Sequence, residues 1–307
     1  MIYTQLRSFH AVAAEGGFTA ASRTLGIGQP TITSQVRALE RYFSVELFYR
    51  RGRSVELTSA GRELFQIAQR IMVLEEEVRD LLNAYGGFHT GHIKVGAVGP
   101  YHAIEMLWAF NERHPGIQLS VTVGNSRDMV ERLLDYSVDV AVLAHAEDDP
   151  RIFAMPYSRH PVVIFVNTDH PWAKQGRRRI QIEELEGQRM VLRETGSTTR
   201  LAVEAALRRA GVTVNPVMEI GSREAVWLAV VRGIGIGAVS DIEYIPHPAL
   251  RVVEVKGAEI FTTAHVNCLT ERKDSRLVRE FFTVARALKA EHNLQARTAR
   301  LRQAKAR

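Results

Sequence analysis

The chain has 307 residues, of which 46% are hydrophobic and 24% charged, a globular composition long enough for two or three domains. The formal charge of +6 and the pI of about 9.6 make a polyanion such as nucleic acid a candidate partner. The one cysteine, Cys268, excludes an intrachain disulfide framework and a cysteine-based zinc finger, and its apolar neighbours predict a buried thiol. No apolar run approaches the roughly 18 residues of a membrane span, and Arg7, His10 and Glu15 interrupt the apolar stretch that a signal peptide would need, so we expect a cytoplasmic protein without a membrane partner.

Residues 1 to about 57 show the pattern of short helices joined by tight turns. Gly16-Gly17 ends a first helix, a second begins at Phe18 or Thr19 and stops at Gly26-Ile27-Gly28, and a third begins at Gln29-Pro30. Spacings of three and four predict that the third helix buries Ile32, Val36, Leu39 and Phe43. A short glycine-containing turn between two such helices is typical of a helix-turn-helix.

The polar face of the third helix and the segment that follows it favour contact with nucleic acid. The face carries Gln29, Thr31, Thr33, Ser34 and Arg37, whose hydrogen-bonding side chains suit base edges and phosphates, although a merely solvated face is the alternative. Arg50-Arg51-Gly52-Arg53 lies between two short apolar runs and predicts a β-wing with three arginines at its tip. Residues 1–62 contain eight arginines and four acidic residues, which leaves a local charge of +4.

A long helix is predicted from Thr58, with a heptad seam that favours pairing with a second copy of the same helix. Its apolar positions alternate in steps of three and four; they are Leu64, Ile67, Ile71, Leu74, Val78, Leu81 and Tyr85. The alternative is an ordinary amphipathic helix.

After the linker Gly86–Gly91, strands and helices alternate: strand Ile93–Val98, helix Ile104–Asn111, strand Ile117–Val123, helix Met129–Leu134 and strand Val138–Leu143. A second run of this kind over about 162–266 predicts two α/β lobes with a ligand cleft between them.

Taken together, these motifs resemble the LysR-type transcriptional regulators over nearly the whole chain. The resemblance is carried by Leu6 with Phe9, Phe18-Thr19-Ala20-Ala21, Leu25, Gln29-Pro30-Thr31-Ile32-Thr33, Leu39-Glu40, Glu46-Leu47-Phe48 and Leu57-Thr58-Ser59-Ala60-Gly61. The family usually has serine where this chain has Gly17, Gly28 and Thr33. The resemblance implies that the helix from Gln29 enters the major groove and that Pro30 is one of its DNA-binding residues. It further implies that the wing arginines meet phosphates or the minor groove, and that the long helix dimerises. It also implies two effector-binding lobes hinged like those of periplasmic binding proteins.

The effector half is similar to regulators associated with 2-aminoethylphosphonate catabolism. That similarity rests on Pro100-Tyr101-His102, Val123-Gly124-Asn125-Ser126, Asp148-Asp149-Pro150-Arg151, Gly196-Ser197-Thr198-Thr199-Arg200 and Ser222-Arg223-Glu224-Ala225-Val226.

The loop at residues 194–200 precedes a helix, so its free N–H groups and three hydroxyls fit an anion. A simple helix cap explains the same residues, and the family resemblance favours the ligand site. The expected effector-binding residues are Pro100, Tyr101, His102, Asn125, Ser126, His145, Ser197, Thr198, Thr199 and Glu224, with Glu224 as a partner for a ligand ammonium. Gly233-Ile234-Gly235-Ile236-Gly237 follows a helix rather than a strand and is therefore no dinucleotide fingerprint.

The sequence therefore predicts a winged helix-turn-helix over 1–58, a linker and dimerisation helix over 59–90, a two-lobed effector-binding α/β domain over 91–292, and a basic tail over 293–307. Lobe 1 takes about 91–161 and 267–292, and lobe 2 about 162–266. The expected partners are double-stranded operator DNA, a small anionic effector, further copies of the chain in a homodimer or tetramer, and RNA polymerase as a candidate. No catalytic residues, metal or cofactor are expected. The alternatives are a regulator that senses another carboxylate or an amino acid, a small-molecule binding protein without DNA binding, and an enzyme built on the α/β part.

Overall fold

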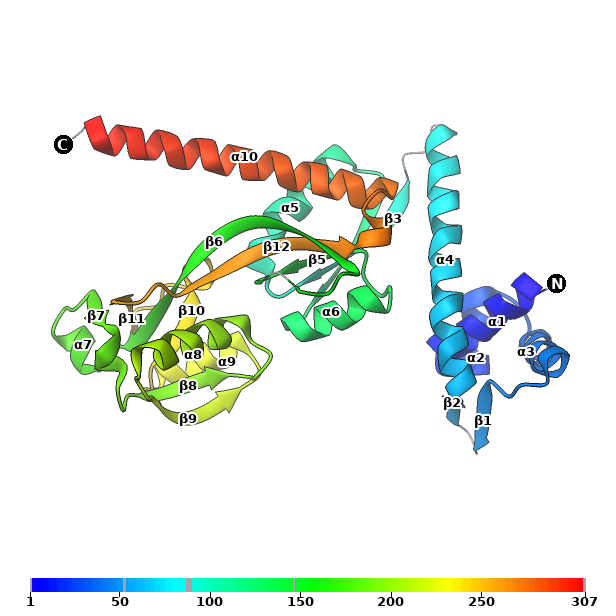
Figure 1. The fold of residues 1–307 in the computed structure, drawn as a ribbon, viewed down its shortest axis with the longest axis horizontal. Helices are drawn as coiled ribbons and strands as arrows, with labels where there is room; N and C mark the ends of the chain where they lie inside the picture. The colour runs from blue at the N-terminus through cyan, green and yellow to red at the C-terminus, as the bar shows by residue number, and fades with distance from the viewer. Residues whose placement is uncertain (1, 52–53, 87–89, 146, 306–307) are drawn as a thin grey trace. The chain divides into compact units, whose positions relative to one another are not determined.

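The computed structural model describes residues 2–51, 54–86, 90–145 and 147–305, with the side chains of all of these except residues 50, 51, 54, 84, 100, 102 and 293–305. The chain divides into two compact units, Met1–Phe88 and His89–Arg307, each with its own hydrophobic core (Figure 1). Within the described ranges, no helix is long and apolar enough to cross a membrane.

The N-terminal unit is a helical bundle with a small hairpin. Its elements are α1 (Ile2–Ala14), α2 (Phe18–Leu25), α3 (Gln29–Phe43), β1 (Phe48–Arg51), β2 (Ser54–Leu57) and α4 (Ser59–Tyr85). Phe9 of α1, Ile32 of α3 and Leu47 are almost completely buried in one cluster, because the apolar stripes of the helices face one another. The predicted helix-turn-helix and the predicted β-wing are both confirmed, and the two strands of the wing are antiparallel.

The ends of α2 and α3 explain one wrong prediction. Gly26 (φ 65°) ends α2 in the left-handed conformation that glycine adopts without strain, and Pro30 occupies the first turn of α3, as expected. Phe43, however, is 54% exposed rather than buried. It is the last residue of α3 before Ser44 turns the chain away at φ 53°, and its ring packs edge-on against Tyr42 instead of the core.

The wing is held to the start of α4 by a close backbone contact. Thr58 donates its N–H to the carbonyl oxygen of Leu47 (3.0 Å), and its hydroxyl donates to the carbonyl oxygen of Glu46 (2.7 Å). The same hydroxyl accepts from the N–H of Gly61 (2.9 Å). A Cβ on Gly61 would lie 2.1 Å from the Leu47 oxygen, so only glycine fits here.

Lobe 1 of the second unit is a twisted sheet covered by helices on both faces. Strands β3 (Gly91–Ala97), β4 (Ile117–Val123) and β5 (Val140–Leu143) run parallel, as the alternation of strands and helices in the sequence predicts, and their order in the sheet is β4-β3-β5. Next come β12 (Phe261–Leu269) and β6 (Ile152–Asn167), which are antiparallel additions that the sequence did not reveal. The covering helices are α5 (Pro100–Arg113), α6 (Ser126–Leu134) and α10 (Arg276–Lys305).

Lobe 2 continues the same sheet and adds a second, two-stranded one. The far half of β6 pairs with β10 and β11, and β7 pairs with β11, while β8 and β9 run parallel. The lobe comprises α7 (Pro171–Lys174), β7 (Arg179–Gln181), η1 (Ile182–Leu185), β8 (Arg189–Arg193), α8 (Thr198–Ala210), β9 (Asn215–Ile220), α9 (Arg223–Val231), β10 (Gly237–Ser240), η2 (Asp241–Glu243) and β11 (Leu250–Lys256).

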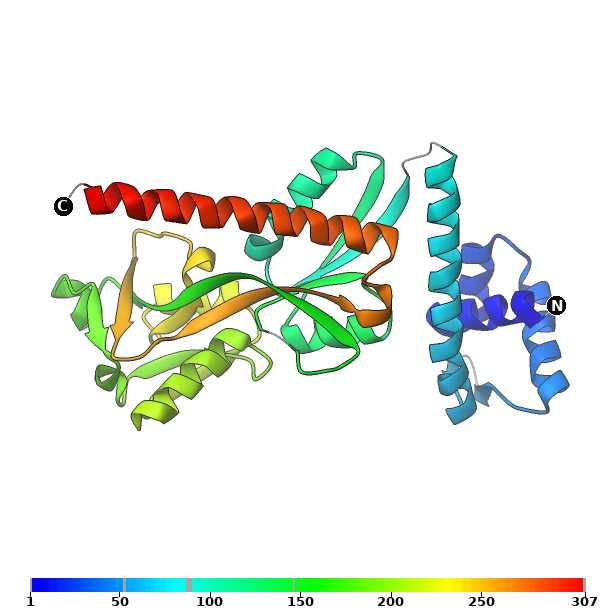
Figure 2. The ribbon, with the colours of Figure 1, turned by 45° about the horizontal axis from the view of Figure 1, so that its top comes forward.

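Two long strands connect the lobes. β6 and β12 lie side by side from one lobe into the other (Figure 2), with a register shift between Ala264 and His265. Cys268 near the end of β12 is fully buried, as predicted, and burial raises the pKa of its thiol to about 12. After the short helix η3 (Thr270–Arg272), the C-terminal helix α10 runs from Arg276 to Lys305 and so continues into the segment expected to be a basic tail.

Candidate functional site

The exposed face of α3 is the first candidate surface. Gln29, Pro30, Thr31, Ser34 and Arg37 are exposed, and all but Thr31 line one groove, together with Thr33 and with residues of the loop after α3. The hydroxyl of Thr33 donates to the carbonyl oxygen of Gln29 (2.9 Å), so it is partly engaged within the helix. The side-chain oxygen of Gln29 accepts from Thr19 of α2 (3.1 Å), which holds this side chain at the start of the groove.

Two of the predicted wing arginines lie on the hairpin. Arg50 and Arg51 belong to β1 and pair with Val55 and Ser54 of β2. Their side chains, and Arg53 as a whole, lie outside the described residues. Their roles in DNA binding therefore stay predictions.

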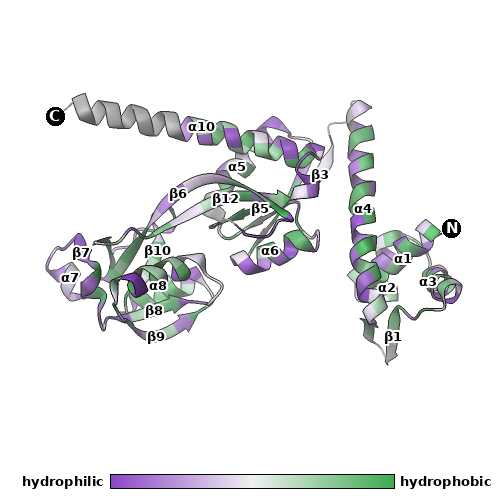
Figure 3. Ribbon diagram, in the orientation of Figure 1, coloured by the Kyte–Doolittle hydropathy of each residue, from purple (hydrophilic) through white to green (hydrophobic). Residues whose placement is uncertain are grey.

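The heptad seam of α4 divides between two environments. Leu64 and Ile71 are partly buried against the core of the N-terminal unit, so part of their apolar surface packs within one copy of the chain, and their pairing with a second copy stays a prediction. The other seam residues and the neighbouring Leu82 are between 48% and 85% exposed. Figure 3 shows apolar residues recurring along α4. The exposed stripe of α4 consists of Ile67, Leu74, Val78, Leu81, Leu82 and Tyr85.

In the second unit, the starts of α6 and α8 come from opposite lobes and meet. Two of the predicted donors are helix caps: the Asn125 side chain accepts from the N–H of Asp128 (3.0 Å), and the Ser197 hydroxyl accepts from the N–H of Arg200 (3.4 Å). For these two side chains the capping interpretation applies. A Cβ on Gly196 would lie 3.3 Å from Asn125, so the two loops are in close approach.

A chain of hydrogen bonds crosses the lobes at this point. The hydroxyl oxygens of Ser126 and Thr198 lie 2.9 Å apart, and Thr198 Oγ1 lies 3.3 Å from Nδ1 of His145. The other ring nitrogen of His145 is 2.5 Å from the Glu147 carboxylate. The structure therefore brings together the three predicted residues Ser126, His145 and Thr198, with their polar groups satisfied by one another.

Sequence reasoning missed two arginines that border this cleft. Arg223 opens α9, where a cation faces the positive end of the helix dipole, and it is compensated by Glu243 at 2.7 Å. Its guanidinium also reaches the carbonyl oxygen of Val98 in lobe 1 (3.5 Å). Arg193 ends β8 and makes two hydrogen bonds to Glu194 (2.8 and 2.9 Å). A cation at the first position of a helix is the signal in the sequence that would have flagged Arg223.

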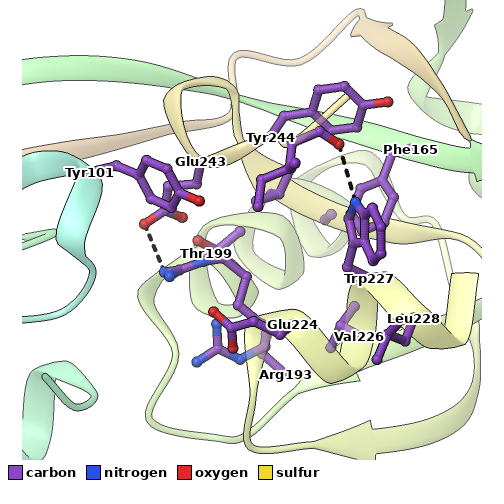
Figure 4. A pocket seen from close by; sticks show the side chains of 14 residues that line it. Tyr101, Phe165, Arg193, Thr199, Glu224, Val226, Trp227, Leu228, Glu243 and Tyr244 are labelled. Atoms are coloured by element: carbon purple, nitrogen blue, oxygen red, sulfur yellow. Dashed lines mark hydrogen bonds and ion pairs between the residues drawn. The ribbon is translucent and has the colours of Figure 1, made fainter. Parts of the chain in front are cut away.

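Beside this cleft lies a cavity of about 230 Å³ that opens between the lobes (Figure 4). Tyr101 of α5 borders it from lobe 1, and Thr199 and Glu224 border it from lobe 2, as the sequence predicts. Pro100 and His102 lie next to Tyr101 at the start of α5, but their side chains are outside the described residues. The other lining residues are Phe165, Arg193, Arg223, Val226, Trp227, Leu228, Ala238, Val239, Glu243, Tyr244 and Ile245.

Among the described residues at this cavity, Glu224 is the carboxylate without a cationic hydrogen-bond partner. Its carboxylate accepts from the Ser222 hydroxyl (2.7 Å), and this bond, together with the nearby guanidinium groups of Arg223 and Arg193, lowers its pKa. Arg193 and Arg223 are each paired with a glutamate of their own. Counting these five side chains, two positive charges face three negative ones at the cleft and the cavity mouth.

Comparison with known proteins decides the family. Residues 3–62 match the bacterial regulatory helix-turn-helix protein model of the lysR family, and residues 86–290 match the LysR substrate binding domain. The chain belongs to the LysR family of transcriptional regulators. It is therefore a DNA-binding regulator with an effector-binding domain, and the resemblance inferred from its motifs is confirmed at this level.

The LysR relatives and structures agree with this assignment. The chain is 34% identical to a RuBisCO operon transcriptional regulator of Allochromatium vinosum over 77% of this chain and 78% of the relative. It is 30% identical to the transcriptional activator CmpR of Synechocystis sp., over 82% and 84%.

Among solved structures, a full-length cysteine variant of OxyR from Pseudomonas aeruginosa superposes with a TM-score of 0.75 at 22% identity, covering 93% of this chain and 95% of that one. The regulatory domain of CcmR from Synechocystis PCC6803 in complex with 2-PG has a TM-score of 0.59 at 25% identity, covering 64% and 97%. None of these four names mentions a phosphonate.

Proposed function

We propose that this LysR regulator responds to a small zwitterion that carries an anionic group and an amino group, with 2-aminoethylphosphonate as the first candidate. The observation that carries the proposal is the position of Glu224, a carboxylate at the mouth of the same cavity that Thr199 borders at the start of α8. A ligand with charge of one sign would pair with either the Glu224 carboxylate or the positive start of α8, but not with both.

The anionic end of the ligand is assigned to the start of α8. The first N–H groups of a helix have no partners within the helix, and they favour an anion there through the helix dipole. Thr198 and Thr199 add hydroxyl donors, and Arg193 adds a guanidinium close by. Because Thr198 now bonds Ser126 and His145, we propose that an anion enters by replacing the Ser126 hydroxyl as the partner of Thr198.

The amino end of the ligand is assigned to Glu224. A lowered pKa keeps this carboxylate ionised at neutral pH, and the excess of one negative charge among the five charged side chains favours a ligand that brings a cation. An amino acid meets the same charge requirement. The structure of CcmR with 2-PG makes 2-phosphoglycolate the second candidate effector for this chain, but that anion has no amino group to offer Glu224.

Calorimetry with the full chain tests the effector. We expect 2-aminoethylphosphonate to bind the wild type more tightly than 2-phosphoglycolate does. Glu224→Gln should weaken the first about tenfold, because it loses the ammonium partner, and should strengthen the second, because it loses a repulsion. Glu183→Gln, an exposed carboxylate on η1 outside the cavity, is the matched control. If only 2-phosphoglycolate gives a binding heat, and Glu224→Gln does not change its affinity, the proposal of a zwitterionic effector is wrong.

On the DNA side, we propose that α3 reads the operator in the major groove and that the wing contacts its backbone. Gln29 is exposed at the start of α3, which suits a contact with a base edge. Gln29→Ala should change the preferred base at one position of the half-site, at a cost of about 1–3 kcal/mol there. Gln66→Ala on α4 is the control. An unchanged preferred half-site in a binding selection would count against the placement of Gln29.

We further propose that the chain acts as a homo-oligomer whose copies pair through the exposed stripe of α4. A stripe of six large apolar residues on one helix is costly to leave in water, and a second copy offers the same surface. RNA polymerase as a partner and a cytoplasmic location belong to the same proposal. The alternative of a small-molecule binding protein without DNA binding is set aside, because the helix-turn-helix matches the lysR family model.

A further inference from the structure

The cavity beside the interlobe cleft is larger and more apolar than a primary amino group needs. Its inner wall includes Phe165, Val226 and Val239, which are at most 6% exposed, and the rings of Trp227 and Tyr244 complete it. A cavity needs only about 10–15 Å³ on this measure to hold one water molecule, so 230 Å³ has room for a group much larger than a primary ammonium. Figure 4 shows Trp227 and Phe165 together at one side of the cavity, and Glu224 and Arg193 together in the lower part of the view.

The hydrogen-bonding groups of this wall are poor partners for a primary ammonium. Such a group has three N–H donors, and each needs an acceptor when it leaves water. The indole N–H of Trp227 is itself a donor and is already bonded to the carbonyl oxygen of Ile245 (3.2 Å). Valine and phenylalanine side chains offer no acceptor, and the hydroxyl of Tyr244 cannot serve all three N–H groups. A nitrogen that carries methyl groups instead of hydrogens leaves no donor unsatisfied there.

The same wall suits a positive charge that is spread over methyl groups. Four aromatic side chains border the cavity, Tyr101 from lobe 1 and Phe165, Trp227 and Tyr244 from lobe 2. Aromatic faces attract quaternary ammonium groups, and methyl groups bury apolar surface against them. Glu224 at the mouth adds a carboxylate that, within the described part of the chain, accepts a side-chain hydrogen bond only from the Ser222 hydroxyl.

We propose that the effector of this regulator carries an N-methylated ammonium group, and that this group fills the cavity between Tyr101 and Trp227 while Glu224 neutralises its charge. The proposal rests on the zwitterion proposed above and narrows its class to N-alkylated aminoalkyl anions. Because Tyr101 belongs to lobe 1 and Trp227 to lobe 2, a group held between them contacts both lobes.

Three phosphonates test the proposal on the full chain; two of them match in shape and differ in charge, and the third lacks the methyl groups. Calorimetry compares 2-aminoethylphosphonate, its N,N,N-trimethyl derivative, and 3,3-dimethylbutylphosphonate, in which a carbon replaces the charged nitrogen. We expect the trimethyl compound to bind at least fivefold more tightly than each of the other two. Trp227→Leu should abolish that advantage, Trp227→Phe should retain part of it, and Trp108→Leu, an exposed tryptophan of α5 outside the cavity, should leave it unchanged.

The outcomes separate this proposal from the one on which it rests. If 2-aminoethylphosphonate binds as tightly as its trimethyl derivative, the cavity does not take the methylated group, while the zwitterion stands. If 3,3-dimethylbutylphosphonate, which lacks the cationic group, binds as tightly as the trimethyl compound, the cavity is apolar without preference for a cation, and the proposal is wrong. If no phosphonate binds, the proposed anion is wrong, and a titration with tetramethylammonium alone then tests the cavity. Saturable binding that is lost in Trp227→Leu would support a site for a methylated ammonium group, and absence of binding would overturn it.

Discussion

The hydroxyl oxygens of Ser126 and Thr198 lie 2.9 Å apart, although the two residues begin helices in different lobes. Ser126 is the first residue of α6, and Thr198 is the first residue of α8, so two positive helix ends face one another across this contact. Such an arrangement is favourable for an anion placed between the two ends. An anion bound there would contact both lobes, so its binding would depend on how far apart the lobes are.

We expect Thr198→Ala to weaken effector binding about tenfold, because one donor to the anion is lost. Thr198→Ser keeps the oxygen and should bind like the wild type. Binding of effector-free protein to DNA should be the same in all three, since Thr198 lies outside the N-terminal unit. Titration calorimetry and a gel shift provide the two measurements. Equal effector affinity in Thr198→Ala and wild type would show that the start of α8 does not hold the effector.

Removal of the three wing arginines, Arg50, Arg51 and Arg53, should weaken binding to all DNA sequences alike. Each lost phosphate contact lowers the slope of log K against log salt by about one unit. The control removes three exposed arginines of the other unit, Arg113, Arg178 and Arg208, and should leave the slope near that of the wild type. The slope is measured by fluorescence anisotropy over a salt series. If the wing variant keeps the wild-type slope, the wing does not meet phosphates.

Leu74→Glu should break the proposed pairing of α4 without unfolding the N-terminal unit. Leu74 is 58% exposed, whereas Ile71, one turn earlier, is partly buried in the core and is unsuitable for this test. The substitution places a carboxylate from each copy in one apolar contact, which is costly. Gln66→Glu adds the same charge on the same helix at an exposed polar position. Sedimentation should give a smaller species for Leu74→Glu only; equal sedimentation of both variants would mean that this stripe does not pair.

Gly61→Ala should destabilise the N-terminal unit by roughly 3 kcal/mol, because the new Cβ would lie 2.1 Å from a backbone oxygen that cannot move freely. Gly17→Ala, where no atom lies within 4 Å of the added Cβ, should cost no more than about 1 kcal/mol, because Gly17 is the N-cap of α2 and alanine caps a helix less well than glycine. Hydrogen exchange of α1 and α3 in the full chain measures the difference. Equal protection in the two variants would show that the contact between α4 and Leu47 is not tight.

Cys268 should not react with a thiol reagent at pH 8 in the folded protein, and it should react once the protein is unfolded. Burial raises the pKa of this thiol from about 9 to about 12, so the thiolate is scarce when the chain is folded. Since the folded pKa is the higher one, the corresponding stability is complete below pH 9 and is lost as the pH rises towards 12. Rapid labelling of the native protein at pH 8 would show that β12 opens readily.

The sequence alone determined the features that depend on residues close together in the chain. Helix starts and stops follow from local backbone preferences, so Gly26, Pro30 and the heptad spacing were sufficient to predict the helix-turn-helix and the long α4. The parallel strands β3, β4 and β5 follow from alternating runs of known period. The family motifs then pointed to the start of α8 and to Glu224.

Only the tertiary structure decided which side chains share an environment. Leu64 and Ile71 have the same spacing as Leu74 and Val78, yet the first two pack in the core and the others face water, because the core covers only part of α4. The pairing of Arg223 with Glu243 joins residues 20 apart in the sequence, and the cavity joins Tyr101 to Trp227 across two lobes. No local pattern records such contacts, since they arise from strands β6 and β12, which bring distant segments together.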